Sequence, residues 1–297
     1  MKTSHVLTLL IFALFLSARA EEATLDDQGE AALKAGNFDG ALGLFNEAIQ
    51  KNPEDSRAYC GRAYTYSGKQ DYDRAQADCT TAIKLNPGYA KAYCVLGNIN
   101  WVKGKDEDAV SDFDEALHLD PKDAGIWYNR GLYYLHKDND KTITDMSEVI
   151  RLAPDYERAY YIRGDAYFDQ QKYGDAIQDY SEAIRLFPQS GNLYHQRGFA
   201  YEKSGEFDKA IEDFGRAIQF KPGSDVEYYA RGYTYSETHN YQKAIEDYSE
   251  AISLSPKKDG YYYQRGVAYL QVGDKERAAE DFKESTLLKG QQGQQPK

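Results

Sequence analysis

Residues 194–222 read YHQRGFAYEKSGEFDKAIEDFGRAIQFKP, and this stretch decides the fold. Its first part has the i, i+3, i+4, i+7 spacing of one helix face, with the residues Tyr194, Arg197, Gly198 and Tyr201. Its second part has a similar helical period, with Ala210, Phe214 and Ala217. Pro222 then ends the second helix, because proline lacks the N–H donor that a helix needs. The stretch therefore predicts two antiparallel helices joined by a short turn.

The same pattern returns about every 34 residues along the chain. The aligned rows are 22–55, 56–89, 90–123, 124–156, 157–190, 191–224, 225–258 and 259–292. The eighth position of a row is glycine except at Ala63, and the twentieth is alanine except at Thr142. Position twenty-four is large in most rows, as at Tyr180 and Phe214. Small residues beside large ones let the two helices of a hairpin pack closely.

This 34-residue pattern resembles the tetratricopeptide repeat family over residues 22–292. The resemblance implies an all-α, right-handed superhelical solenoid of eight helix-turn-helix repeats. A single hairpin leaves one apolar face open, so neighbouring hairpins are expected to stack around one continuous core. We therefore expect residues 21–292 to form one elongated repeat domain.

The two ends of the chain differ from the repeats. Residues 1–20 combine Lys2, an apolar run and the sequence Ala18-Arg19-Ala20, which is typical of a secretory signal peptide cleaved near Ala20. An uncleaved anchor is the alternative, although the apolar run is short for a bilayer and no other segment is a membrane candidate. We expect an exported protein, periplasmic or secreted, that does not span a membrane. Residues 293–297 are expected to form a flexible polar tail.

Composition limits the partners. The formal net charge is −12, and loss of the leader with its Lys2 and Arg19 makes it more negative. Nucleic acid is not an expected partner, because phosphate binding needs clustered positive charge.

The three cysteines are Cys60, Cys79 and Cys94. Cys79 takes a core position, and we expect it to act as a small buried hydrophobe. Cys60 and Cys94 take the same position in adjacent first helices, where helix spacing favours free thiols. A strained disulfide between Cys60 and Cys94 in an oxidising compartment is the alternative.

Arginine and aspartate recur together along the rows. Position seven holds Arg62, Arg130, Arg163, Arg197, Arg231 and Arg265, and position twenty-three of the same rows holds Asp78, Asp145, Asp179, Asp213, Asp247 and Asp281. One interpretation of the recurring arginines is a basic stripe that binds an anion. The matched acids instead indicate a structural ladder of arginine–carboxylate pairs within or between rows.

In the resembling family, the first helices line a concave groove, and the resemblance implies that positions two, five, nine, twelve and thirteen point into it. These positions are rich in aromatic rings, which are interleaved in the C-terminal half with carboxylates such as Asp165. The candidate groove residues with rings or acids are Tyr64, Trp101, Tyr128, Tyr161, Asp165, Phe168, Phe199, Tyr229, Tyr233 and Tyr263. Tyrosine and tryptophan suit a surface that is wet when empty and apolar when occupied. Packing of these rings against one another is the structural alternative.

Three further groove residues, Asn98, Asn129 and Arg158, partly match a carboxylate clamp by which some family members hold acidic C-termini of chaperones. Cys94 and Ile162 stand where the clamp has cations. Loss of these charges removes most of the attraction for an anion, so we interpret the match as a coincidence.

Nothing in the sequence indicates an enzyme. The histidines show no metal-ligand spacing, and the glycines form no phosphate loop, so no catalytic residue, metal or cofactor is predicted.

We therefore predict an exported, non-catalytic scaffold that binds a partner peptide or helix in its aromatic groove. Two alternatives stay open. One is a homo-oligomer that self-assembles through an uncapped last repeat, since the chain turns polar at Gly290 without an evident capping helix. The other is a cell-wall or carbohydrate-binding module, because exported clefts rich in tyrosine and tryptophan can stack on sugars.

Overall fold

A computed structural model describes residues 24–292 of the chain, and within them it contains sixteen helices and no strand. The signal peptide predicted at 1–20 and the tail predicted at 293–297 lie outside the described residues. The helices are α2 Leu25–Lys34, α3 Phe38–Lys51, α4 Ser56–Gly68, α5 Tyr72–Leu85, α6 Ala90–Val102, α7 Asp106–Leu119, α8 Ala124–Tyr134, α9 Asn139–Leu152, α10 Glu157–Asp169, α11 Tyr173–Leu186, α12 Gly191–Ser204, α13 Phe207–Phe220, α14 Asp225–Glu237, α15 Tyr241–Leu254, α16 Asp259–Gln271 and α17 Lys275–Gln292.

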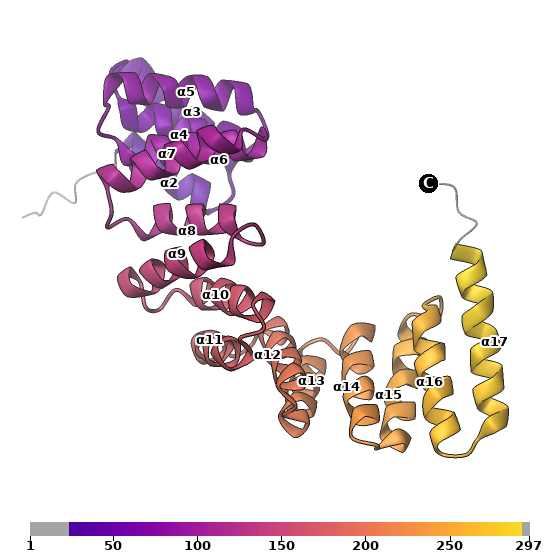
Figure 1. Ribbon diagram of the computed structural model, residues 1–297. Helices are drawn as coiled ribbons and strands as arrows, with labels where there is room; N and C mark the ends of the chain where they lie inside the picture. Colours follow the sequence, from indigo (N-terminus) through magenta and orange to yellow (C-terminus); the bar gives the residue numbers. More distant parts are fainter. Residues whose placement is uncertain (1–23, 293–297) are drawn as a thin grey trace, which may run out of the picture. The chain divides into compact units, whose positions relative to one another are not determined.

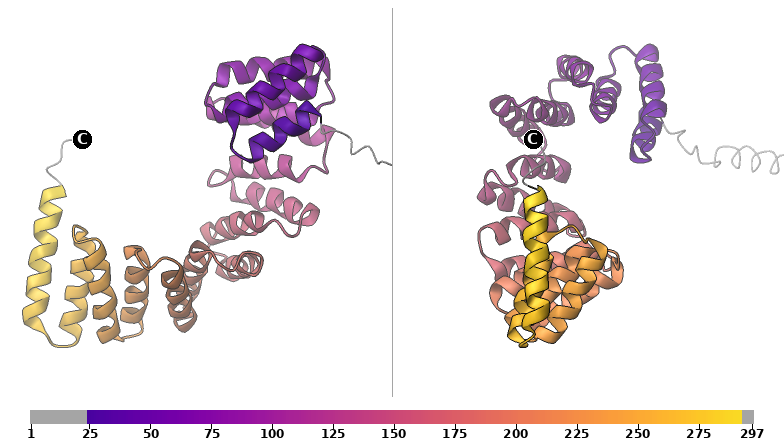
Figure 2. Two further views of the ribbon diagram at one scale, coloured as in Figure 1. Left: turned by 180° about the vertical axis from the view of Figure 1, so that it is seen from behind. Right: turned by 90° about the vertical axis from the view of Figure 1, so that its right-hand side faces the viewer.

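The helices follow one another as hairpins, which confirms the all-α helical-repeat fold (Figure 1). They divide into two compact units, with the boundary inside α8 between Ile126 and Trp127. The N-terminal unit, described from residue 24, contains α2 to α7. The C-terminal unit, described to residue 292, contains most of α8 and all of α9 to α17. In the C-terminal unit, α14 to α17 lie side by side in sequence order, as the views of Figure 2 also show.

Close packing of a glycine against a ring joins the two helices of a hairpin. A β-carbon at Gly164 would lie 2.8 Å from Cε1 of Tyr180, and one at Gly198 would lie 2.9 Å from Cε1 of Phe214. Both rings are fully buried. No side chain fits at these glycines without displacing the ring, so the predicted pairing of small and large residues is confirmed.

The turn between the two helices of a hairpin contains a residue with positive φ. Gly36, Gly104, Gly205 and Gly273 fill this place in some hairpins. Gln70, His136, Gln171 and His239 fill it in others, although this conformation costs a side-chain-bearing residue energy. The left-handed residue lets the chain reverse direction within a few positions.

The predicted arginine ladder is structural and lies within hairpins. In Arg163, Nε and Nη2 donate to the two carboxylate oxygens of Asp179 at 2.8 and 2.7 Å. The third corner, Nη1, donates to Oγ of Ser147 on the preceding second helix at 2.9 Å. Burial raises the pKa of Asp179 even though Arg163 lowers it. The ladder therefore orders the packing of three helices more than it adds stability.

The ladder differs at Arg231. Arg197 and Arg265 bond Ser181 and Ser249 through Nη1, as Arg163 bonds Ser147. At Arg231 the corresponding residue is Gly215, whose β-carbon would lie 3.6 Å from Nη1. Arg231 keeps both bonds to Asp247 but has no side-chain acceptor on α13.

The three cysteines are free and buried, as predicted for the favoured alternative. Burial raises the pKa of Cys60 and of Cys94 to about 12, so both stay protonated thiols at neutral pH.

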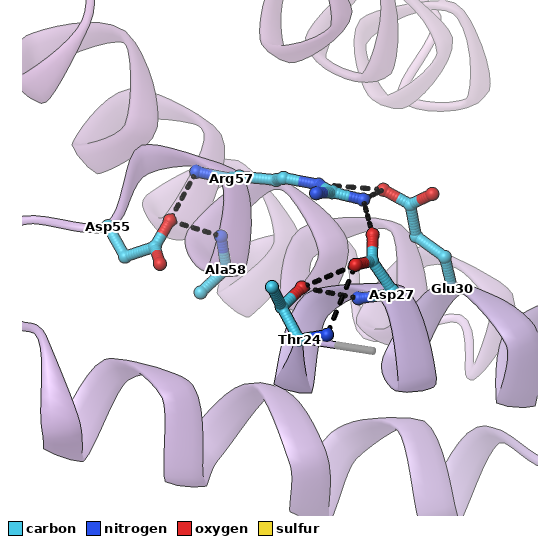
Figure 3. A network of polar contacts seen from close by, with 6 residues as sticks. All are labelled: Thr24, Asp27, Glu30, Asp55, Arg57 and Ala58. Atoms are coloured by element: carbon cyan, nitrogen blue, oxygen red, sulfur yellow. Dashed lines mark hydrogen bonds and ion pairs between the residues drawn. The ribbon is translucent and has the colours of Figure 1, made fainter. Parts of the chain in front are cut away.

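The N-terminal unit begins with a dense polar network (Figure 3). Thr24 caps α2 through a capping box with Asp27. Arg57 of α4 reaches back to α2 and donates to Asp27 at 2.6 Å and to Glu30 at 2.9 Å. Asp55 caps α4 by accepting from the backbone N–H groups of Arg57 and Ala58. The network closes the first hairpin onto the second.

At the other end, α17 continues through Gly290 to Gln292, so the expected loss of helix at Gly290 is wrong. Lysine and glutamine are good helix formers, and one glycine does not stop them. The last second helix also differs from the earlier ones. It carries Ala279 and Thr286 where α15 carries the partly or fully buried Ile245 and Ile252. The positions that would contact a following hairpin are therefore smaller or more polar.

Candidate partner-binding site

An open cleft of about 310 Å³ lies between α10 and α12 in the C-terminal unit. We call it the phenylalanine cleft, and it is lined by Phe168, Tyr180, Gln196, Phe199 and Lys203. Phe168 comes from the last turn of α10 and Phe199 from the middle of α12, whereas the third ring, Tyr180, comes from α11. Both phenylalanine rings are partly buried and were predicted as groove residues. The walls of the cleft are mainly carbon, with the amide of Gln196 and the ammonium of Lys203 as polar groups.

A partly buried polar cluster around Asp165 includes two of the residues that line the cleft, Tyr180 and Gln196. Asp165 of α10 accepts from the hydroxyl of Tyr180 at 2.7 Å and from Nε2 of Gln196 at 3.1 Å. Burial raises the pKa of Asp165, although these donors lower it. Burial, followed by the charge of Asp165, raises the pKa of Tyr161 to about 12. The cluster joins three helices, so it fixes the side chains that line the cleft.

The Phe199 wall of the cleft is held in place by a histidine–glutamate pair. His195 of α12 contacts Glu227 of α14 through Nδ1 and Oε2 at 2.5 Å, and both side chains are largely buried. The His195 ring packs edge to face on Phe199, with ring centroids 4.8 Å apart. Phe199 in turn packs on Phe214 at 5.5 Å. His195 is thus a positioning residue for the Phe199 wall.

A second group of side chains lies on the same first-helix face, on α12 and α14. We call Glu202, Tyr229, Tyr233 and Glu237 the tyrosine–carboxylate patch. Thr234 of α14 donates to Glu202 of α12 at 3.5 Å, which places the two helices in contact here. Burial raises the pKa of Tyr233, and the carboxylates of Glu237 and Glu202 raise it further. Within the patch, the side chain of Glu202 is buried, whereas that of Glu237 is exposed.

The predicted groove residues of the C-terminal unit fall into two groups. Asp165, Tyr161, Phe168, Phe199, Tyr229 and Tyr233 belong to the cleft, its supporting cluster or the patch, and Tyr229 also stacks on Tyr261 at 4.8 Å. The others lie outside them: Tyr128 packs on Tyr156 at 5.2 Å, Tyr263 is 53% exposed, Asn129 is partly buried and Arg158 is exposed. Ring-on-ring packing therefore accounts for some of the predicted aromatic groove.

In the N-terminal unit the predicted groove residues differ in exposure. Tyr64 is 53% exposed on α4, while Asn98 and Trp101 are partly buried on α6. An open depression in this unit lies elsewhere, around Lys69 and Tyr72 at the turn between α4 and α5. It was not predicted from the sequence.

Sequence reasoning missed three residues of the phenylalanine cleft. Tyr180 occupies the core position that is Phe in other rows, and its hydroxyl is what reaches Asp165. The joint occurrence of Tyr180 and Asp165 in one row was the available signal. Gln196 and Lys203 gave no signal, because polar residues are common on exposed helix faces.

Among residues 24–292, no group of three or more histidine, cysteine, aspartate or glutamate side chains is arranged to hold a metal ion. No helix in that range has the length and apolar character needed to cross a bilayer.

Comparison with family models identifies the repeats. Models described as tetratricopeptide repeat match residues 32–77, 60–124, 107–142, 191–224 and 260–292, and a model described as TPR repeat matches 164–205 and 237–273. The chain belongs to the tetratricopeptide repeat family, whose members are in general protein–protein interaction scaffolds built on a typically non-catalytic fold.

Individual relatives match parts of the chain. Small glutamine-rich tetratricopeptide repeat-containing protein 2 of Saccharomyces cerevisiae is 30% identical over 107 residues, which cover 36% of this chain and 30% of that protein. Hsp70-Hsp90 organizing protein of Triticum aestivum is 28% identical over 99 residues, covering 33% of this chain and 17% of that protein. The match thus spans less than a third of either relative.

A solved structure shows the same fold over more of the chain. The C-terminal part of a TPR repeat-containing protein from Cytophaga hutchinsonii aligns with a TM-score of 0.65 and 21% identity. The alignment covers 80% of this chain and 98% of that one.

Proposed function

We propose that this protein is an exported, non-catalytic scaffold that binds an extended segment or helix of another protein on the first-helix face of its C-terminal unit. An apolar side chain of the partner occupies the phenylalanine cleft between Phe168 and Phe199. The observation that carries the proposal is the cleft itself, an apolar depression on helices of a family of interaction scaffolds. Buried apolar anchors in such pockets supply much of the affinity of an interface.

The lining of the cleft favours a peptide over a sugar. A carbohydrate needs several hydrogen-bonding groups around its ring, whereas the partly buried rings of the cleft, Phe168 and Phe199, present mainly carbon. The carboxylate of Asp165 is already engaged by Tyr180 and Gln196. An apolar side chain loses fewer hydrogen bonds on entering the cleft than a sugar does.

Self-assembly through the last repeat has less support. Ala279 and Thr286 of α17 replace the isoleucines through which an earlier second helix packs on its successor. Less apolar area is then available to hold a second copy at this end.

Export rests on the leader-like residues 1–20. Mass spectrometry of the protein recovered outside the cytoplasm of its producing cells tests it. A mature N-terminus near Glu21 is expected, and an intact N-terminus on protein retained in the cytoplasm would contradict export.

Selection of binders from a displayed library of random dodecapeptides tests the binding proposal. The purified chain should enrich peptides with an apolar residue, and a Phe168→Ala, Phe199→Ala double variant should lose the enriched peptides. Tyr263→Ala is the matched control, because it removes an exposed ring outside the cleft. Equal binding of the selected peptides by the double variant and the native chain rules out the cleft as the site.

A further inference from the structure

The face that carries the phenylalanine cleft also carries unbalanced negative charge on α12 and α14. The tyrosine–carboxylate patch contributes Glu202 and Glu237. Lys203 is the cation nearest to them in the described contacts, with Nζ 3.2 Å from Oε1 of Glu202. One ammonium against two carboxylates leaves an excess negative charge beside Tyr233. Glu237 lies one helical turn after Tyr233 on α14, and Glu202 contacts Thr234, the residue next to Tyr233, at 3.5 Å.

Neighbouring charges on this face do not offset the excess. Asp169 at the end of α10 is engaged by His136, with Nδ1 2.9 Å from Oδ2. Glu227 is engaged by His195. Arg158 is the other cation at a groove position of the unit, and it lies at the start of α10 beside Tyr128, away from the end of α14 that carries Glu237. The exposed carboxylate of Glu237 therefore faces solvent next to a tyrosine ring without a cation of its own.

A tyrosine ring flanked by carboxylates is a receptor for a basic side chain. The negative face of the ring attracts an ammonium or guanidinium group, and a carboxylate at the ring edge adds a charge-assisted hydrogen bond. The rim of an interface uses such charges for steering and partner choice. An acidic partner would meet repulsion at the same place.

We propose that the partner segment is basic, with a lysine or arginine on the tyrosine–carboxylate patch and an apolar side chain in the phenylalanine cleft. This inference rests on the proposed function, because it uses the same cleft as its anchor. First helices of neighbouring hairpins lie roughly 10 Å apart, and an extended chain advances about 3.3 Å per residue. The basic residue therefore lies about three positions from the apolar one in an extended segment.

The same random dodecapeptide library, read position by position, tests the inference. With the native chain, sequences carrying an apolar residue and a lysine or arginine about three positions away are expected to dominate. Glu237→Gln should bind the selected peptides about threefold more weakly, which is the size of one exposed charge pair. Lys203→Ala should bind them more tightly, because it removes the competing ammonium. Glu250→Gln, which removes an exposed carboxylate on the second helix α15, is the control for net charge.

The outcomes separate this inference from the proposed function. Enrichment of apolar residues alone, or of apolar residues with aspartate or glutamate, overturns the basic partner and leaves the cleft as a binding site. Selected peptides that bind equally to the Phe168→Ala, Phe199→Ala variant overturn the proposed function. Absence of any enriched peptide overturns both. Thermal melting of each variant, followed by circular dichroism, verifies that the helices are retained.

Discussion

The first-helix faces of the two units share one backbone pattern but differ in chemistry. In the N-terminal unit, position five holds the buried Asp26, Cys60 or Cys94, and Arg57 bonds both Asp27 and Glu30. In the C-terminal unit, the same position holds Tyr128, Tyr161, His195, Tyr229 or Tyr263. At this position the first unit has small buried side chains and closed ion pairs, whereas the second unit has rings. A few positions per repeat thus decide whether a hairpin stack presents a binding surface.

The largest effect is expected where the common framework is broken. Arg197→Met leaves Asp213 buried without its cation and should lower the free energy of unfolding by about 3 kcal/mol. Urea denaturation followed by circular dichroism measures the change. The Arg197→Met, Asp213→Leu double variant should recover most of the loss, since both charges are then gone. A double variant as unstable as the single one would contradict the view that the ladder mainly orders the packing.

The packing between the helices of a hairpin should be the next most sensitive feature. Gly164→Leu places a side chain against Tyr180 and should cost about 2 kcal/mol by overpacking. Gly174→Ala is the control, because its β-carbon would meet no atom within 4 Å. The control is expected to melt at or above the native temperature. Equal melting temperatures of Gly164→Leu and the native chain would contradict close packing at this glycine.

The buried carboxyl of Asp26 in the N-terminal unit allows a test of pH dependence. Burial, followed by the charge of Asp55, raises the pKa of Asp26 from 3.8 to about 6. The folded protein then binds this proton more tightly than the unfolded chain, so the group adds stability as the pH falls from about 6 to about 4. At pH 7 the ionised Asp26 is a cost, and Asp26→Asn should be more stable by about 1 kcal/mol.

Thermal melts of Asp26→Asn and the native chain between pH 4 and pH 8 measure this difference. The advantage of the variant should shrink below pH 6. Asp175→Asn, an exposed first-turn acid on α11, should show no such trend. A constant difference across the range would contradict the assignment.

The smallest effect concerns the different position in the ladder. Gly215→Ser supplies the hydroxyl that Arg231 lacks on α13 and should stabilise the C-terminal unit. Gly215→Ala gives the gain in helix propensity alone. The serine variant should exceed the alanine variant by about 0.5 kcal/mol once their different propensities are subtracted. Equal stabilities after that correction would show that the serine bonds of Arg197 and Arg265 add nothing.

The sequence predicted the hairpins, the glycine–ring contacts and the arginine ladder because each depends on residues close together in one repeat. Phe168 and Phe199 were predicted because the resemblance to the tetratricopeptide repeat family implies which first-helix positions point into the groove. Lys203 and Gln196 were not predicted, because their role depends on the space between two helices. The proximity of Asp26 and Asp55 was missed likewise, since it joins separate hairpins. The end of α17 was misjudged because helix propensity over Lys289 to Gln292 outweighed the single glycine.

The left-handed turn residues have a consequence for communication along the chain. A glycine in this conformation reverses the chain and touches nothing, as at Gly205, where a β-carbon would meet open space. His136 reverses the chain and also reaches Asp169, the last residue of the next first helix. A turn residue that carries an imidazole therefore contacts the end of the neighbouring first helix, whereas a glycine at the same place makes no such side-chain contact.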